Sequence, residues 1–257
     1  MICSECTRPI GLHGARGYCP RHYQRWRKHG DSSTVLPSGN TQGRLWKRTL
    51  NQEYFDDINT SERAYWLGFF TADGCVQRRE HSYLISLCLK ESDKDHVQLF
   101  CDALGADHPL RFREDTNTVR VTIGSKRMVE SLERLGVTPR KSLTAQPWVG
   151  PESLMSHYWR GLFDGDGTIY HSTAGWFLGI VGSLACVEAF ADWARLVSGS
   201  KAKYSKASGC WVWKVCGGPM PQLLAKALYE DAPVALPRKR ARAEDLMAIN
   251  FSQHRRG

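Results

Sequence analysis

Two nine-residue segments of this chain are alike and share five of their nine residues: residues 66–74 read WLGFFTADG and residues 159–167 read WRGLFDGDG. Each contains two small residues four positions apart: Gly68 and Ala72 in the first, Gly161 and Gly165 in the second. Residues four apart lie on one face of a helix, and small side chains there let a second backbone approach closely. We therefore predict that two helices, one from each segment, pack against each other through these residues.

The two segments open two copies of the same order of secondary structure. Hydrophobic periodicity, turn residues and helix-capping residues predict helix, strand, strand, helix, strand, strand, helix in each copy. The predicted helices cover 60–72, 92–105, 125–136, 153–164, 183–199 and 219–231, with a closing helix at 242–250. The predicted strands cover 75–79, 83–90, 110–114, 118–124, 168–172, 176–182, 201–206 and 210–216. This repeat indicates duplication of a whole α+β unit, so pseudo-twofold symmetry is expected.

Each segment ends in Asp followed by Gly, at Asp73 and at Asp166. Carboxylates at a helix C-terminus lie at the negative end of the helix dipole, and two brought together repel each other. A divalent cation reverses this cost, since Mg²⁺ accepts carboxylate and phosphate oxygens and can activate water for phosphodiester hydrolysis. Asp-Gly also suits an ordinary turn from helix to hairpin. Two copies with the same small-residue spacing favour the metal site.

On these residues, the two segments resemble the signature helices of the LAGLIDADG homing endonucleases, in their single-chain, two-repeat form. The resemblance extends over residues 52–250. It implies two αββαββα units whose sheets form a saddle over DNA and whose signature helices form the interface. It also implies that Asp73 and Asp166, together with Gly74 and Gly167, form the site of the catalytic Mg²⁺ or Mn²⁺.

The resemblance assigns further residues around this site. Asp164 matches an acid that is usually a structural helix-end residue, whereas the first copy has Thr71 there. A polar residue at the end of the second strand matches Lys90 in the first copy. The second copy offers only Val181 or Gly182, so that half lacks this group.

Each copy ends in a matching basic segment, TPRKSLT at 138–144 and LPRKRAR at 236–242. These segments supply Lys141 and Lys239, and the resemblance implies a basic residue after the third helix. Lysine at such a site holds a water or offsets charge that develops on the phosphate. An ordinary surface contact with phosphate explains Lys90, Lys141 and Lys239 equally well.

Basic residues on the predicted strands are candidate DNA contacts: Arg78, Arg79, Arg111, Arg113, Arg120, Lys201, Lys203 and Lys206. Arg111 and Arg113 flank Phe112, so both arginines share one face of the sheet. Lys201 and Lys203 are spaced in the same way in the matching strand of the second copy. Arginine addresses guanine edges in the major groove, and lysine more often contacts phosphate. Each single charge also fits a solvated strand, but the symmetric placement of the two pairs favours a DNA-binding surface.

The first 30 residues form a Cys/His-rich unit. Its pattern C-x2-C-x12-C-x2-H consists of Cys3, Cys6, Cys19 and His22. Thiolates and imidazole at this spacing suit a structural tetrahedral Zn²⁺ site. His13 or His29 could replace His22 as the fourth ligand.

The positive charge of the chain is concentrated near this unit. Residues 1–48 hold nine Lys or Arg and two acidic residues, out of a net charge of +9 for the whole chain. The segment RHYQRWRKHGD predicts a helix that contacts phosphate through Arg25, Arg27 and Lys28. The unit resembles small zinc-binding modules of phage and mobile-element endonucleases, which implies an extended DNA footprint. A protein-contact module is the alternative.

The expected organisation is a zinc module at 1–30, a linker at 31–51, repeats at 52–147 and 148–250, and a basic tail at 251–257. No apolar run reaches the length of a membrane helix, no signal-peptide pattern opens the chain, and the nine cysteines suit reduced thiols or metal ligands. We therefore expect a cytoplasmic protein of bacterial or phage context.

The function that follows is a monomeric, metal-dependent DNA endonuclease of the homing type. It would cut both strands of a long, specific duplex site and leave 3′ overhangs, as the resemblance implies. A maturase that binds intron RNA and a DNA-binding regulator are alternatives on the same fold, although the presence of both Asp73 and Asp166 disfavours the regulator. An intein is not expected, since the chain opens with Met and closes with HRRG.

Overall fold

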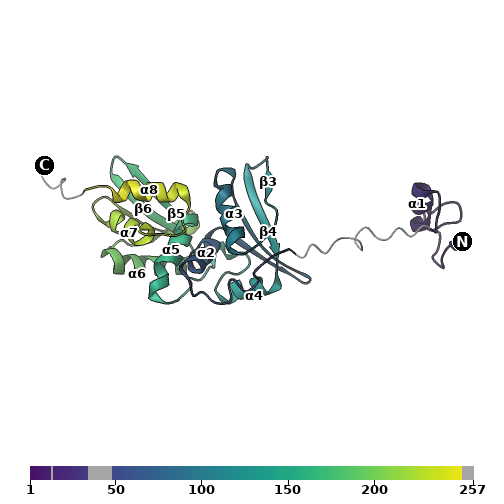
Figure 1. The fold of residues 1–257 in the computed structure, drawn as a ribbon, viewed down its shortest axis with the longest axis horizontal. Coiled ribbons are helices and arrows are strands. Elements are labelled where there is room, and N and C mark those ends of the chain that lie inside the picture. Colours follow the sequence, from purple (N-terminus) through teal and green to yellow (C-terminus); the bar gives the residue numbers. More distant parts are fainter. Residues whose placement is uncertain (13, 34–47, 251–257) are drawn as a thin grey trace. The chain divides into compact units, whose positions relative to one another are not determined.

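The structure is a computed structural model and describes residues 1–12, 14–33 and 48–250. The chain divides into two compact units, Met1–Lys47 and Arg48–Gly257, which we describe separately (Figure 1). Most of the expected linker at 31–51 lies outside the described residues, as do His13 and the basic tail at 251–257.

The first unit consists of short turns followed by one helix. Helix α1 runs from Pro20 to His29. Pro20 stands at the first helical position, where a missing backbone N–H has no helical partner to lose. Gly30 ends the helix in the left-handed conformation, and its N–H donates to the carbonyl of Trp26. Two isolated β-bridges close the turns before α1: Ile2 with Pro9 and Ala15 with Tyr18.

The second unit contains two copies of one α+β arrangement, in the element order that the sequence predicts (Figure 1). The first copy comprises α2 (Ser61–Ala72), β1 (Gly74–Arg79), β2 (Ser82–Lys90), α3 (Lys94–Ala103), β3 (Arg111–Arg113), β4 (Thr118–Gly124) and α4 (Lys126–Arg134). The second comprises α5 (Glu152–Asp166), β5 (Gly167–Ser172), β6 (Gly175–Gly182), α6 (Leu184–Ser198), β7 (Ser205–Ala207), β8 (Cys210–Cys216) and α7 (Met220–Tyr229). Two 3-10 helices, η1 (Glu91–Asp93) and η2 (Lys141–Leu143), and the closing helix α8 (Pro237–Met247) complete the unit. The predicted fold class is confirmed.

Each copy builds a four-stranded antiparallel sheet, in the orders β1-β2-β4-β3 and β5-β6-β8-β7. The registers match, since Gly74 pairs with Leu87 in the first sheet and Gly167 pairs with Ile180 in the second. Every second residue of β4 is buried, and α3 and α4 contact the sheet from that side. One face of the sheet therefore packs under helices and the other is open.

Capping side chains explain where several helices begin and end. Thr60 precedes α2 and accepts a hydrogen bond from the N–H of Arg63. Ser183 precedes α6 and accepts from the N–H of Cys186, and Gly199 ends α6 in the left-handed conformation. Hydroxyl side chains satisfy N–H groups that have no helical partner, so these positions favour the observed boundaries.

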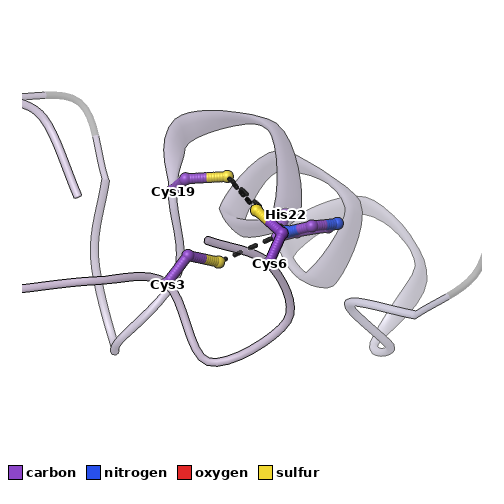
Figure 2. Close-up of side chains that lie close together, drawn as sticks. All are labelled: Cys3, Cys6, Cys19 and His22. Atoms are coloured by element: carbon purple, nitrogen blue, oxygen red, sulfur yellow. Dashed lines mark hydrogen bonds between the residues drawn. The ribbon is translucent and has the colours of Figure 1, made fainter. Parts of the chain in front are cut away.

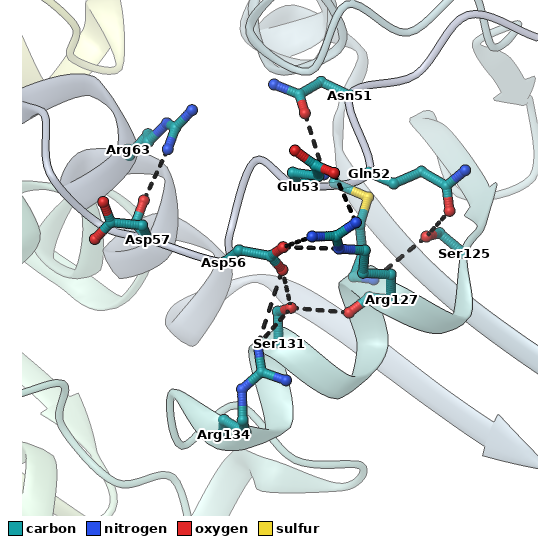
Figure 3. A network of polar contacts seen from close by, with 11 residues as sticks. Asn51, Gln52, Glu53, Asp56, Asp57, Arg63, Ser125, Arg127, Ser131 and Arg134 are labelled. Atoms are coloured by element: carbon teal, nitrogen blue, oxygen red, sulfur yellow. Dashed lines mark hydrogen bonds and ion pairs between the residues drawn. The ribbon is translucent and has the colours of Figure 1, made fainter.

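A polar network holds the segment before α2 against α4 (Figure 3). Arg127 on α4 donates hydrogen bonds to the carboxylates of Asp56 and Glu53. The hydroxyl of Ser131 also donates to Asp56. This hydrogen bond and the charge of Arg127 lower the pKa of Asp56, so its carboxylate stays ionised and fixes the chain that leads into α2.

Two predicted elements differ most from their observed bounds. The strand expected at 201–206 comprises only Ser205–Ala207, because the preceding residues serve other partners. The carbonyl of Ala202 accepts the indole N–H of Trp213, and the Tyr204 hydroxyl donates to Glu188 on α6. Helix α8 begins at Pro237, inside the basic segment expected to precede it, since proline suits the first turn of a helix.

Candidate catalytic centre and nucleic-acid interface

Helices α2 and α5 cross with their backbones in contact. A Cβ added to Gly68 would lie 1.9 Å from the carbonyl oxygen of Tyr158, and a Cβ added to Gly161 would lie 1.9 Å from that of Tyr65. A Cβ added to Gly165 would lie 2.4 Å from the Cβ of Ala72. The structure thus brings all four small residues of the repeated segments into this helix contact, and the two central glycines leave no room for a side chain.

This contact brings the two terminal aspartates together. Asp73 is the C-cap of α2, and Asp166 is the last residue of α5. The Asp73 Oδ2 atom would be 3.2 Å from a Cβ on Gly165, the residue before Asp166. Asp73 is exposed to solvent and Asp166 is half-buried. Two carboxylates therefore lie at adjoining helix ends, on a surface that ligands can reach.

The electrostatics of the pair follow from this crowding. Desolvation by the surrounding protein, and then the charge of Asp73, raise the pKa of Asp166 to about 6. Desolvation also raises the pKa of Asp73, although Lys141 and Lys239 oppose the shift. Two carboxylates that hinder each other's ionisation fit a divalent cation with oxygen ligands, which removes the repulsion.

Two buried lysines stand at the same helix ends. The Lys141 Nζ donates to the carbonyl of Ala72 at 2.8 Å, and the Lys239 Nζ donates to the carbonyls of Phe163, at 3.1 Å, and Gly167. Each cation thus caps the negative end of the helix dipole of its own repeat. Desolvation lowers the pKa of Lys239 to about 8 and also lowers the pKa of Lys141. The Gly167 carbonyl, expected beside the metal, faces Lys239.

The two basic segments that carry these lysines differ in local structure. In the first, Arg140 adopts the left-handed conformation before η2. In the second, Pro237 starts α8. The two similar PRK sequences therefore adopt different backbone conformations, yet each places its lysine at the C-terminal end of the first helix of its repeat.

The register of β2 places Lys90 two residues beyond the position that is level with Asp73. The register sets Leu87 opposite Gly74, so Cys88 is the β2 residue level with Asp73. Lys90 is two residues farther along β2 and is exposed.

The expected match of Lys90 with Val181 or Gly182 is wrong. In the second sheet Ile180 is opposite Gly167, so Val181 corresponds to Cys88. The counterpart of Lys90 is Ser183. Counting back from the next helix fails here because η1 intervenes between strand and helix in the first copy only.

Asp164 is fully buried and satisfied by the protein. It accepts hydrogen bonds from the hydroxyls of Tyr65 and Tyr229 and from the N–H of Leu236. Thr71, at the same place in the first copy, donates to the carbonyl of Leu67 one turn earlier. Asp164 thus ties α5 to α2 and to the chain before α8, as a structural residue does.

Sequence reasoning missed Arg238. Its Nε lies 3.0 Å from a carboxylate oxygen of Asp93, and its charge acts to lower the pKa of Asp73. The basic segment at 236–242 was the signal for this residue. Its partner Asp93 belongs to the other repeat, so only the tertiary structure reveals the pair.

The open face of the first sheet carries four of the predicted arginines: Arg79, Arg111, Arg113 and Arg120. Arg111 lies opposite Arg120 across β3 and β4. Arg113 forms an ion pair with Asp115 at 2.6 Å. A surface pocket of about 500 Å³ on this face is lined by Arg48, His108, Pro109, Arg111, Arg113, Arg120 and Thr122.

Four other predicted contacts do not lie on an open sheet face. Arg78 pairs with Tyr83 on the helix-covered face and forms an ion pair with Glu133 of α4 at 2.8 Å. Lys206 lies opposite Trp211, whose face also holds the buried Trp213. Lys201 and Lys203 precede β7 and belong to no strand. One step in the alternation of a strand moves a side chain to the other face, and the sequence leaves that step undetermined.

The open face of the second sheet carries residues that sequence reasoning missed. Tyr170 and Phe177 stack with ring centroids 4.8 Å apart and planes within 3° of parallel. Lys214 lies on this face between buried neighbours of β8. The alternation in CWVWKVC, with large apolar residues on either side of the lysine, was the available signal.

In the first unit, four side chains converge as Figure 2 shows. The potential ligand atoms of Cys3, Cys6, Cys19 and His22 lie within 4.8 Å of one another. The Cys3 and Cys19 sulfurs are 3.3 and 3.5 Å from His22 Nδ1, and the Cys6 and Cys19 sulfurs are 3.9 Å apart. Tetrahedral zinc, with Zn–S of about 2.3 Å and Zn–N of about 2.0 Å, spaces its ligands roughly 3.5 to 3.8 Å apart.

The thiols of this cluster suit a metal. Desolvation raises the pKa of Cys3, but backbone hydrogen bonds from Cys19 and Glu5 and the contact with His22 outweigh it and lower the pKa to about 6. All nine cysteines of the chain are free of disulfides. His29, the alternative ligand at the end of α1, is not among the converging atoms.

The predicted phosphate-contacting residues of this unit lie on α1. Arg27 and Lys28 are exposed in the last turn, and Arg25 is half-buried. No residue of α1 is buried, so the helix presents its cations to solvent.

No family model matches the chain, and no curated protein matches it. Among solved structures, the chain is similar to the LAGLIDADG homing endonuclease I-LtrWI bound to target DNA, with a TM-score of 0.51 and 12% identity over 77% of this chain and 89% of that one. It is also similar to the LAGLIDADG meganuclease I-AabMI bound to uncleaved DNA, with a TM-score of 0.50 and 12% identity over 74% of this chain and 89% of that one. Mesophilic variants of the homing endonuclease I-DmoI match with a TM-score of 0.51 and 17% identity over 76% and 99%. The chain therefore has the two-repeat LAGLIDADG fold.

Within the described residues, no helix combines the length and the apolar composition needed to cross a bilayer.

Proposed function

We propose that this chain is a divalent-metal-dependent DNA endonuclease of the homing type, which cleaves both strands of a long, specific site as a monomer. The observation that carries the proposal is the pairing of Asp73 and Asp166 at adjoining helix ends, with each repeat contributing one. Strands β1 and β5, each in a sheet with one open face, begin beside this pair at Gly74 and Gly167. Similarity in fold to endonucleases bound to DNA supports the same function.

The residues of the centre would divide the work as follows. Asp73 and Asp166 would hold Mg²⁺ or Mn²⁺, which when bound activates water and stabilises the oxygens of the phosphodiester. Lys141 and Lys239 are anchored on helix-end carbonyls, so each would set a positive charge beside a scissile phosphate without a cost of reorganisation. Cleavage of one bond per repeat would leave the 3′ overhangs expected of the family.

The test compares the wild type with Asp73→Asn and Asp166→Asn on duplex DNA from the genomic locus of the element, with the element removed. Both variants should lose cleavage by more than about 100-fold, since even residues that only support metal ligands matter 10- to 100-fold. Both should still retain the duplex in a gel-shift assay. Asp192→Asn is the matched control, because Asp192 lies exposed on α6 and pairs with Arg195.

Two outcomes would contradict the proposal. Wild-type cleavage rates in either variant would show that the aspartates are not the metal site. Binding of the duplex by the wild type, with no cleavage in Mg²⁺ or Mn²⁺, would favour a DNA-binding regulator.

We also propose that Cys3, Cys6, Cys19 and His22 hold a structural Zn²⁺ and that α1 adds phosphate contacts. Free thiols fit the cytoplasmic setting expected from the sequence. Native mass spectrometry should show one zinc ion per wild-type chain and none for Cys6→Ser. Cys216→Ser, at an exposed cysteine of β8, should keep the ion. Zinc loss in both variants, or in neither, would contradict the assignment.

A further inference from the structure

The two sheets are equivalent strand by strand, but their open faces carry different side chains. Arg111 lies opposite Arg120 across β3 and β4, as Ser205 lies opposite Val212 across β7 and β8. Register thus matches Arg111, Arg113 and Arg120 of the first sheet with Ser205, Ala207 and Val212 of the second. Three arginines of one face have no charged counterpart on the other.

The open face of the first sheet carries positive charges that do not stabilise the sheet. Like charges directly opposite each other across two strands destabilise a sheet. Among the residues that the structure describes, neither Arg111 nor Arg120 has an ion-pair partner, and both line the pocket of about 500 Å³ with Arg48. A partner with fixed acceptors removes the repulsion. Guanine offers two such acceptors, O6 and N7, to one guanidinium in the major groove.

The second face instead carries an apolar cluster, alongside Lys214 of β8. Its stacked Tyr170 and Phe177 occupy the places of Gln77 and Leu84, as the pairing of these residues shows. Tyr170 is 45% exposed and Val181 is 40% exposed, so this apolar surface is open to a partner. In the major groove, the apolar group that a base presents is the C5 methyl of thymine.

The occupant of the second face follows from its position. Strand β1 begins at Gly74, directly after Asp73, and β5 begins at Gly167, directly after Asp166. A duplex whose scissile bonds lie at the two aspartates must extend outward over both open faces. The apolar face therefore continues the proposed DNA interface.

We propose that the two faces read half-sites of unlike composition. Arg111 and Arg120 select guanines in the half-site over β1–β4. Tyr170, Phe177 and Val181 select thymines, through their methyl groups, in the half-site over β5–β8. This inference rests on the proposed function and adds the chemistry of its target.

The experiment uses the full-length Asp166→Asn variant, so that bound duplex is not cut. A partly randomised duplex library is selected for binding and sequenced. In the selected duplex, deoxyuridine then replaces thymine and 7-deazaguanine replaces guanine, in one half-site at a time. Deoxyuridine lacks only the methyl group, so affinity should fall about fourfold per contacted thymine, in one half-site only. Loss of guanine N7 should weaken binding about fivefold or more, in the other half-site only.

Variants assign each half-site to its sheet. Arg111→Ala and Arg120→Ala should abolish the effect of 7-deazaguanine, while Tyr170→Ser should abolish the effect of deoxyuridine. Arg195→Ala is the charge-matched control on α6 and should change neither. Equal effects of both base analogues in both half-sites would overturn the inference alone. Retention of no duplex at all would overturn the proposed DNA binding, and the inference with it.

Discussion

The centre of the second unit is alike in the two repeats, whereas the outer sheet faces are not. At the centre, Gly68 and Gly161 each come equally close to the backbone of the opposite helix. Lys141 and Lys239 reach equivalent helix ends although their segments fold differently. On the outer faces, Arg111, Arg113 and Arg120 of the first repeat correspond to the uncharged Ser205, Ala207 and Val212 of the second. The comparison indicates that contact between the repeats restricts the sequence more tightly than the shared strand register does.

The largest expected effect tests whether the centre is truly symmetric. Gly68→Ala and Gly161→Ala should each lower the free energy of unfolding by about 4 kcal/mol or more, because a Cβ would overlap a rigid backbone carbonyl. Alanine otherwise favours a helix over glycine by up to about 1 kcal/mol, so the direction of the change is itself informative. Urea unfolding of the two variants should give equal losses.

Gly124→Ala is the matched control for these substitutions. The nearest atom to a Cβ on Gly124 is 3.7 Å away, so we expect less than about 1 kcal/mol. A loss at Gly68 much smaller than at Gly161 would break the symmetry of the centre.

The contact between α2 and α5 was predicted well from the sequence because its pattern of small residues is local and occurs in both repeats. Small residues four positions apart define the face on which the two helices pack. The Asp at the end of each segment is then placed by the same helix contact. The strands at 118–124 and 210–216 were predicted at their observed bounds.

The outer faces were predicted less well because their side chains depend on register. Arg78 is one residue from Arg79, yet that step sends it to the helix-covered face. Lys206 is opposite Trp211 for the same reason. The ion pair of Arg238 with Asp93 joins two repeats, and no local pattern encodes it.

A second prediction concerns Asp164 and Thr71, which occupy the same place in the two repeats but form different hydrogen bonds. Asp164→Ala would leave three buried donors without their acceptor, so the free energy of unfolding should fall by about 2–4 kcal/mol. Thr71→Ala removes only one hydrogen bond within α2, and we expect a loss of about 1 kcal/mol. Urea unfolding of both variants measures the difference. Equal losses would mean that Asp164 does not tie the repeats together.

The smallest expected effect is the stabilisation of the second unit by Mg²⁺ bound between the two repeats. Its pH dependence follows from the pKa of Asp166. The carboxyl has an ordinary pKa of 3.8 and a pKa of about 6 in the folded protein, so without metal the folded state holds the proton more tightly. The contribution of this bound proton to the free energy of unfolding is complete below pH 3.8 and is lost as the pH rises through about 6. Mg²⁺ requires the ionised form, so its stabilisation runs in the opposite direction and grows over the same interval.

At pH 8, Mg²⁺ at tenfold its dissociation constant should stabilise the second unit by about 1.4 kcal/mol, which raises Tm by roughly 3–5 °C. At pH 5 the carboxyl is mostly protonated, so the gain should fall to about 0.4 kcal/mol. Differential scanning calorimetry with and without Mg²⁺ measures both values. Asp166→Asn should abolish the gain at either pH, and so should Asp73→Asn if the two repeats share one cation site. A gain that is equal at pH 5 and pH 8, or that survives in one of the two variants, would mean that the cation binds to one repeat alone or elsewhere on the chain.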